Sequence, residues 1–329
     1  MTVGWSDMKL TQSGDGVNWN FNYDHTKLNG DCFMVQTFAN AAYPSHTGTR
    51  YIITNRANSQ YGFATNTDAQ VNVTTGNANP GVYYLPPGGT TPLLLKDNWQ
   101  SGTGNGGGTV RGNPMWITVD APRDRIFVSV TNSDPSIAGI WRGDGLHNGA
   151  GSVVWTKLAM NVSAPLAARG GAPMSTRPFN IRVLDDHKLL VSYACRLPTS
   201  GDWEMSSGVF YSTDDGATAK DVSVPGMFYY TLDVVPDPGD PLNTWYACVW
   251  RTEQTNATKP STNLGGGAWR TTNRGRSALG GRGFDDGCAR NPGRSGGDLG
   301  VLNERERSRH SDRKSTRLNS SHEWISRMP

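Results

Sequence analysis

Long apolar runs and cofactor motifs are missing from this chain of 329 residues. No stretch approaches the roughly 18 consecutive apolar residues that a membrane-spanning helix needs, and residues 1–19 lack the apolar core of a signal peptide. The chain also has no Gly-x-Ser-x-Gly elbow, no P-loop and no dinucleotide-binding glycine pattern. These absences argue against transmembrane helices and against a nucleotide-dependent enzyme, and no cofactor is expected.

Cysteine is scarce, at four residues. That number is too small for a disulfide scaffold, and neither the cysteines nor the six histidines have the spacing of a metal site. No metal is therefore expected. Cys195 and Cys248 each end a Tyr-Ala-Cys tripeptide within an apolar run, which predicts a repeated core position, with a disulfide between them as the alternative.

Basic residues are concentrated at one end of the chain. The net charge is +3, but residues 268–329 hold 13 of the 31 Lys and Arg residues and only 7 of the 28 Asp and Glu residues. The body before residue 268 is therefore mildly acidic and lacks the basic surface of a nucleic-acid-binding protein. No nucleic-acid partner is expected for it.

The C-terminal residues differ in composition from everything before them. Residues 312–329 resemble the translation of a sequencing-library adapter, so we expect an artefactual tail and a natural gene that extends further. Residues 279–311 are rich in Gly and Arg, and Phe284 is their only aromatic residue. We expect this segment to be disordered or frameshifted, with a basic nucleic-acid-binding tail as the alternative.

Glycine and tryptophan are abundant, at 40 and 11 residues, which favours a turn-rich β protein over a helical one. A tetrapeptide of glycine, an apolar residue, an aromatic residue and Tyr or Arg occurs four times, with starts 58, 69 and 59 residues apart. The four copies are Gly81–Tyr84, Gly139–Arg142, Gly208–Tyr211 and Gly267–Arg270. Each follows a β-branched or aromatic run, which indicates a repeated pair of adjacent strands.

Short apolar segments before and after these pairs predict a unit of four antiparallel strands. One such meander cannot bury both faces by itself and must stack on its neighbours. We therefore predict an all-β fold, a β-propeller with four-stranded antiparallel blades and with blades missing, and an irregular β-sandwich is the alternative. The predicted propeller fragment covers residues 1–278, with a partial blade at 1–26 and blades at 27–99, 114–158, 177–225 and 229–278.

A polar turn follows the third tetrapeptide, at residues 212–220. Its Gly216 suits a positive φ angle, while the side chains of Ser212 and Asp214 can accept hydrogen bonds from backbone amides. The turn resembles the Asp-box, or BNR repeat, of sialidases, sortilin-like proteins and glycoside hydrolase family 74-like propellers, although Ala219 stands where that motif has Trp. Residues 271–278 and 12–19 are similar but weaker copies. The resemblance covers most of residues 1–278 and implies a structural role for Ser212, Asp214 and Gly216.

The connections on the face opposite this turn are long, as binding loops on a rigid scaffold often are. One of them carries Asp202, Trp203 and Glu204. A carboxyl group whose pKa is raised by partial burial can act as a general acid, and a neighbouring Trp can stack on a sugar ring. We predict Asp202 and Glu204 as the catalytic pair if the protein is a glycoside hydrolase, and ordinary surface acids are the alternative.

Aromatic and arginine side chains near the same face are candidates for ligand binding. Residues 177–182 partly resemble the Phe/Tyr-Arg-Ile-Pro motif of sialidases, in which an arginine binds a carboxylate, so Arg177, Arg182 and Arg196 are considered for that role. Trp116 is a further candidate for an aromatic platform, with a place in the core as its alternative. The predicted ligand-binding residues are Trp203, Arg196, Arg177, Trp99, Phe228 and Tyr229.

These features together predict a secreted Asp-box propeller that is directed at glycans. The expected partner is a polysaccharide or glycoconjugate, and the expected location is extracellular although no signal peptide is present. Activity as a glycoside hydrolase is one hypothesis. The others are a non-catalytic binding or adhesion propeller and a sialidase-like exo-glycosidase.

Overall fold

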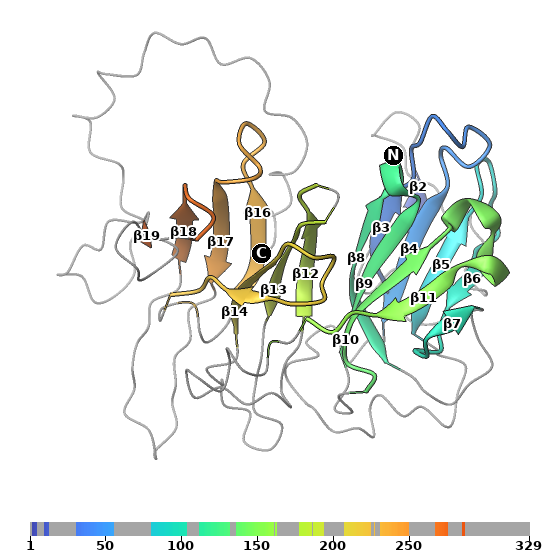
Figure 1. Cartoon of the computed structure of the whole chain (residues 1–329). Coiled ribbons are helices and arrows are strands. Elements are labelled where there is room, and N and C mark those ends of the chain that lie inside the picture. Colours follow the sequence, from blue (N-terminus) through green and yellow to red (C-terminus); the bar gives the residue numbers. More distant parts are fainter. Residues whose placement is uncertain are drawn as a thin grey trace, which may run out of the picture. The chain divides into compact units, whose positions relative to one another are not determined.

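The structure is a computed structural model whose regular elements are short strands and 3-10 turns (Figure 1). No helix within the described residues is long and apolar enough to cross a membrane. The structure describes residues 2–4, 10–12, 31–55, 80–103, 112–131, 136–160, 162, 178–185, 187–193, 207–224, 227, 231–249, 267–275 and 285–286.

Four antiparallel sheets follow one another along the chain, each a meander in sequence order. The first sheet contains β3 (Asp31–Thr37), β4 (Arg50–Asn55), β5 (Gly81–Leu85) and β6 (Leu93–Lys96). The second sheet contains β8 (Asn113–Asp120), β9 (Arg125–Thr131), β10 (Gly139–Asp144) and β11 (Val154–Lys157), with β7 (Gly102–Thr103) added beside β11. The 3-10 turns η4 (Ala121–Arg123), η5 (Leu146–Asn148) and η6 (Ala150–Ser152) connect strands of the second sheet.

The remaining strands form the other two meanders and one small pair. The third sheet contains β12 (Pro178–Val183), β13 (Leu189–Tyr193), β14 (Gly208–Ser212) and β15 (Lys220–Asp221). The fourth sheet contains β16 (Thr231–Pro236), β17 (Trp245–Val249), β18 (Gly267–Thr271) and β19 (Asp285–Asp286). Near the N-terminus, β1 (Thr2–Gly4) pairs with β2 (Leu10–Gln12). The prediction of an all-β fold built from four-stranded antiparallel units is confirmed.

The repeated tetrapeptide forms the third strand of every sheet, and its glycine is the first residue of that strand each time. Two of these glycines are required by the backbone, because Gly139 has φ of +140° and Gly208 has φ of +146°. L-amino acids rarely adopt such angles, whereas glycine adopts them at little cost. An apolar residue and an aromatic residue then follow, and they belong to nearly fully buried strands in β5 and β14, whereas β18 has exposed residues on one face.

Side chains of the first strands join successive sheets to one another. The Gln36 Oε1 atom of β3 accepts the Val119 N–H of β8 at 2.8 Å, and the Thr118 hydroxyl of β8 donates to the Ile181 carbonyl of β12 at 2.5 Å. Arg182 Nε of β12 in turn donates to the carbonyl of Val234 in β16 at 3.2 Å. The first strand of each sheet therefore lies beside the first strand of the next, which is the arrangement of blades in a β-propeller.

Three of the four hydrophobic clusters lie between neighbouring sheets, and the fourth, around Ile52, Tyr83 and Leu85, lies on the first sheet alone. One cluster joins the first sheet to the second, for example Val82 to Trp155. A second joins Phe127 of the second sheet to Phe210 of the third, and another cluster packs side chains of the third sheet against Trp245 of the fourth. Each meander therefore depends on its neighbours for burial of its faces, as expected for stacked repeats.

Two details of the fourth sheet differ from the predictions. Its last strand, β19, pairs with β18 and lies within residues 279–311, beyond the predicted end of the blade at residue 278. Cys248 is exposed and has a free thiol, so its prediction as a core residue is wrong. The side chains of β17 alternate, and those of Trp245, Ala247 and Val249 take the buried face. Cys195 and residues 312–329 lie outside the described residues.

Candidate functional site

The turn between β14 and β15 is fixed by its own side chains. The Ser212 hydroxyl accepts the Gly216 N–H at 2.9 Å and donates to Asp214 Oδ1 at 2.8 Å. Asp214 Oδ1 also accepts the Thr218 N–H at 2.9 Å, and Gly216 has φ of +84°. These hydrogen bonds close the turn locally, which is the structural behaviour that the sequence predicts for Ser212, Asp214 and Gly216.

The turn after β18 repeats this geometry with different side chains. The Thr271 hydroxyl accepts the Gly275 N–H at 2.9 Å and donates to Asn273 Oδ1 at 2.9 Å. Arg274 and Gly275 have φ angles of +60° and +66°, as Asp215 and Gly216 have +56° and +84°. The similarity between the two turns that the sequence suggests is therefore present in the structure.

Asp215 within the first of these turns joins the third sheet to the second. Its carboxylate lies 3.1 Å from the nearly buried Arg125 and 3.7 Å from Arg142, and His187 Nδ1 lies 3.0 Å from it. Burial acts to raise the pKa of Asp215, but the His187 hydrogen bond and the two guanidinium groups outweigh it and hold the pKa below its usual range. The charged form is therefore the one that stabilises this junction.

Asp215→Asn is expected to lower the free energy of unfolding by about 1–3 kcal/mol at pH 7, because buried Arg125 loses a charged partner. The folded-state pKa lies below the unfolded value of about 3.9, so this stabilisation is present above that value and is lost as pH falls through the folded pKa. The melting temperatures of wild type and variant should therefore approach each other as the pH is lowered from 7 to 3. Asp144→Asn removes an exposed partner of Arg142 and serves as the control, and an equal loss in both variants would contradict this role.

The predicted catalytic residues lie on a connection that the structure does not describe. Strand β13 ends at Tyr193 and β14 begins at Gly208, so the segment with Asp202 and Glu204 joins the strands at the end opposite the Ser212–Lys220 turn. This topology is the one that the sequence predicts, and the catalytic roles stay a prediction. The residues outside the described part are Arg177, Arg196, Asp202, Trp203, Glu204, Phe228 and Tyr229.

Trp99 is a core residue and does not offer its ring to a ligand. The residue is 1% exposed, and its ring packs against those of Trp141 and Trp155 at centroid distances of 5.8 and 6.1 Å. Its Nε1–H donates to the Gly112 carbonyl at 3.2 Å. The prediction of Trp99 as a ligand-binding residue is corrected accordingly, because packing between the first two sheets accounts for its position.

A group of five side chains lies on the first strands β8, β12 and β16. All of them except Arg182 lie in the first half of their strand, toward the end of the sheets from which the Asp202 connection leaves. We call this group the first-strand cluster; it comprises Trp116, Phe179, Asn180, Arg182 and Asp233. The rings of Trp116 and Phe179 have centroids 6.2 Å apart, and the guanidinium of Arg182 lies 5.1 Å from the Trp116 ring centroid. Trp116 and Phe179 are partly exposed, and Trp116 also packs against the core cluster between the second and third sheets.

The carboxyl group of Asp233 is the acid of this cluster. It accepts a short hydrogen bond from Asn180 Nδ2, and Arg182 Nη2 lies 3.4 Å from its Oδ1 atom. Burial raises the pKa of Asp233 above its usual value, and the attraction of Arg182 only partly offsets that effect. Asn180 Oδ1 and Trp116 Nε1 are buried, and neither atom has a hydrogen-bond partner among the described residues.

Sequence reasoning found Trp116 and Arg182 but missed Phe179, Asn180 and Asp233. A signal for them exists in the repeat, because Trp116, Asn180 and Asp233 each lie at or beside a β-bulge near the start of a first strand. Bulges redirect side chains and are common beside active sites. Alignment of the first strands, rather than of the tetrapeptides alone, would have placed the three residues together.

Comparison with known proteins gives matches among solved structures only. No protein-family model and no curated protein sequence matches the chain. A GH74 enzyme from Niastella koreensis is 15% identical with a TM-score of 0.49, and the match covers 84% of this chain and 35% of the enzyme. A GH74 xyloglucanase from Xanthomonas campestris is 15% identical with a TM-score of 0.42, covering 71% of this chain and 28% of the enzyme.

A third solved structure also matches part of the chain. YCF48 from Cyanidioschyzon merolae is 11% identical with a TM-score of 0.42, and 75% of this chain and 59% of that protein are covered. The chain spans about a third of the length of the two GH74 enzymes. At these identities and at TM-scores below 0.5, no property of these proteins is transferred to this chain.

Proposed function

We propose that this chain is a glycan-directed propeller of a secreted protein, and that it binds a polysaccharide or glycoconjugate through the first-strand cluster. The observation that carries the proposal is the partly exposed Trp116 and Phe179 pair beside the polar groups of Asn180, Arg182 and Asp233. Sugar rings have apolar faces that stack on aromatic rings and hydroxyl groups that need donors and acceptors at the rim. The cluster supplies both within one small area.

Hydrolysis of the bound glycan is the form of this function that Asp233 favours. A carboxyl group with a raised pKa holds its proton closer to neutral pH and can protonate a leaving glycosidic oxygen. Glycoside cleavage also needs a second carboxyl group, about 5–10 Å away. Asp202 and Glu204 are the candidates, because their connection leaves β13 at the end where Asp233 lies.

Non-catalytic binding is the alternative, and the same cluster serves it without a second acid. The sialidase-like alternative has less support, because Arg182 already donates to Val234 and lies beside Asp233. A guanidinium engaged in this way has fewer N–H groups left for a substrate carboxylate.

Affinity electrophoresis of the full chain against a panel of soluble polysaccharides tests the binding. At least one polysaccharide should retard the protein, and Trp116→Ala should weaken the retardation about tenfold because stacking is lost. Tyr246→Ala, which removes an exposed aromatic ring of β17, should leave the retardation unchanged. If no glycan retards a folded protein, or if both variants weaken binding equally, the proposal fails.

Release of reducing ends from the retarding polysaccharide then separates enzyme from binder. In a hydrolase, Asp233→Asn should lower the rate at least a hundredfold while retardation persists, since the proton donor is removed and the stacking surface stays. Retardation without any release of reducing ends from wild type would support the binding alternative.

A further inference from the structure

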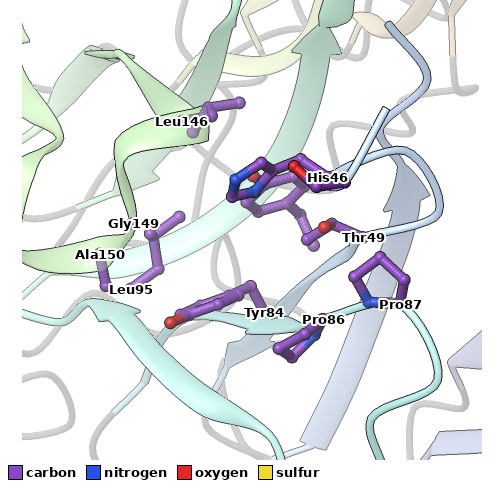
Figure 2. A pocket seen from close by; sticks show the side chains of 11 residues that line it. His46, Thr49, Tyr84, Pro86, Pro87, Leu95, Leu146, Gly149 and Ala150 are labelled. Atoms are coloured by element: carbon purple, nitrogen blue, oxygen red, sulfur yellow. The ribbon is translucent and has the colours of Figure 1, made fainter. Parts of the chain in front are cut away.

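A cavity of about 220 Å³ lies where the first sheet meets the 3-10 turns of the second, and it is separate from the first-strand cluster (Figure 2). Tyr51 of β4, Tyr84 of β5 and Thr49 line it from the first sheet, with His46 and Pro86 from the adjoining connections. Leu146, Gly149 and Ala150 close it from the second sheet. Figure 2 shows the His46 ring and the Tyr84 ring on either side of the space.

Contacts behind the lining hold the two walls of this cavity in place. The Tyr43 ring stacks on His147 of η5 with centroids 4.0 Å apart and an angle of 8° between the planes. The His147 N–H donates to Asp124 Oδ1 at 3.0 Å, and Asn40 Nδ2 donates to the Ala121 carbonyl at 2.6 Å. The cavity is therefore formed before a ligand arrives, which reduces the entropy cost of binding.

The hydroxyl groups of Tyr51 and Tyr84 are the polar groups that a ligand in this cavity would bind. Tyr51 is 2% exposed, and none of the hydrogen bonds within the described residues reaches its hydroxyl or that of Tyr84. Burial, with the nearby Asp124 and Tyr84, raises the pKa of Tyr51, so the phenol stays protonated and remains a donor. Each hydroxyl can therefore exchange hydrogen bonds with a ligand in the cavity.

The lining combines these hydroxyls with apolar surfaces and contains no Lys, Arg, Asp or Glu side chain. We propose that the cavity binds one neutral sugar ring, with hydroxyl groups of the sugar bonded to Tyr51 and Tyr84 and an apolar face of the ring against Pro86 and Leu146. The cavity is smaller than the roughly 300–1,000 Å³ of pockets for drug-sized ligands, so one ring is the size that fits. A proline ring of a peptide has a similar shape but carries no ring hydroxyl groups that could bond to Tyr51 and Tyr84.

The equivalent places at the other junctions have different chemistry. Arg142 occupies in the second sheet the tetrapeptide position that Tyr84 has in the first, and it lies beside Asp215 of the third. Tyr211 has this position in the third sheet and lines a cavity of about 200 Å³ that also contains Lys220 and Arg274. An uncharged lining therefore distinguishes the cavity between the first and second sheets from these two positions.

In the test, the full chain is titrated with methyl β-glucopyranoside, methyl β-galactopyranoside and methyl α-xylopyranoside. Binding is measured from the shifts of the NMR lines of the sugar. At least one glycoside should bind saturably, and Tyr51→Phe should weaken it about tenfold through the loss of one hydrogen bond. Because no hydrogen bond within the described part of the chain reaches that hydroxyl, the melting temperature of Tyr51→Phe should equal that of wild type. Ala150→Leu fills the cavity and should abolish binding, whereas Tyr246→Phe is the matched control and should bind normally.

Absence of saturable binding by all three glycosides, or binding that is the same in Tyr51→Phe and Ala150→Leu as in wild type, would overturn the proposal. So would saturable binding of an acetylated tetraproline peptide in place of the sugars. The readout uses single sugar rings and variants at this cavity. The result for this cavity is therefore independent of whether the first-strand cluster retains polysaccharides.

Discussion

Trp99→Ala is expected to lower the free energy of unfolding by about 3–5 kcal/mol, because a fully buried indole is replaced by a methyl group. Trp99 fills the space between the first two sheets, in contact with Trp141 and Trp155 and with its Nε1–H bonded to Gly112. The surrounding strands belong to hydrogen-bonded sheets and cannot collapse into the cavity that remains. Urea unfolding followed by tryptophan fluorescence and by circular dichroism measures the change.

Trp99→Phe provides the graded comparison for this prediction. This variant keeps most of the apolar contact but removes the Nε1–H donor. Its decrease in the free energy of unfolding should therefore be much smaller than that of Trp99→Ala. Tyr246→Ala, at a position 39% exposed, should change stability by less than about 1 kcal/mol. A small effect of Trp99→Ala would show that the interface between the first two sheets is not packed as described.

Gly216→Val is expected to cost more than about 3 kcal/mol, through two separate effects. The φ angle of +84° is unfavourable for a β-branched residue. A Cβ atom at this position would also lie 2.7 Å from Leu158 Cδ1 and 3.2 Å from Leu158 Cβ, in the second sheet. The variant should therefore unfold at much lower urea concentration, with the third sheet separating from the second.

Gly151→Val is the control for a change of the same size at an open position. Gly151 lies in η6, and a Cβ atom added there meets nothing within 4 Å. Its unfolding midpoint should stay close to that of wild type. Similar losses in Gly216→Val and Gly151→Val would contradict the assignment of the β14–β15 turn as a contact between sheets.

The strands of this fold are predictable because one short pattern marks them repeatedly. Gly81, Gly139, Gly208 and Gly267 begin β5, β10, β14 and β18, and the apolar runs before them form the second strands. The turn at Ser212 is also predictable, since its hydrogen bonds lie within five residues of the chain. Local chemistry decides both features, so the sequence alone is sufficient for them.

The candidate site was less predictable because its contacts come from packing between sheets. Arg182 and Asp233 lie 51 residues apart in the chain, and only the placement of β12 beside β16 brings them together. Trp99 follows the last strand of the first sheet and has the position of a loop residue in the sequence, yet the second sheet covers it completely. The sequence predicts Tyr51 and Tyr84 as strand residues. The cavity beside them exists only because connections of two different sheets meet there.

Hydrogen–deuterium exchange of the full chain with and without the retarding polysaccharide tests the central claim most directly, because it locates the bound glycan. The account predicts slower exchange at the starts of β8, β12 and β16, around Trp116, Asn180 and Asp233, with little change at the Ser212–Lys220 turn. Protection confined to other strands, with none at these three, would contradict the assignment of the first-strand cluster as the glycan site.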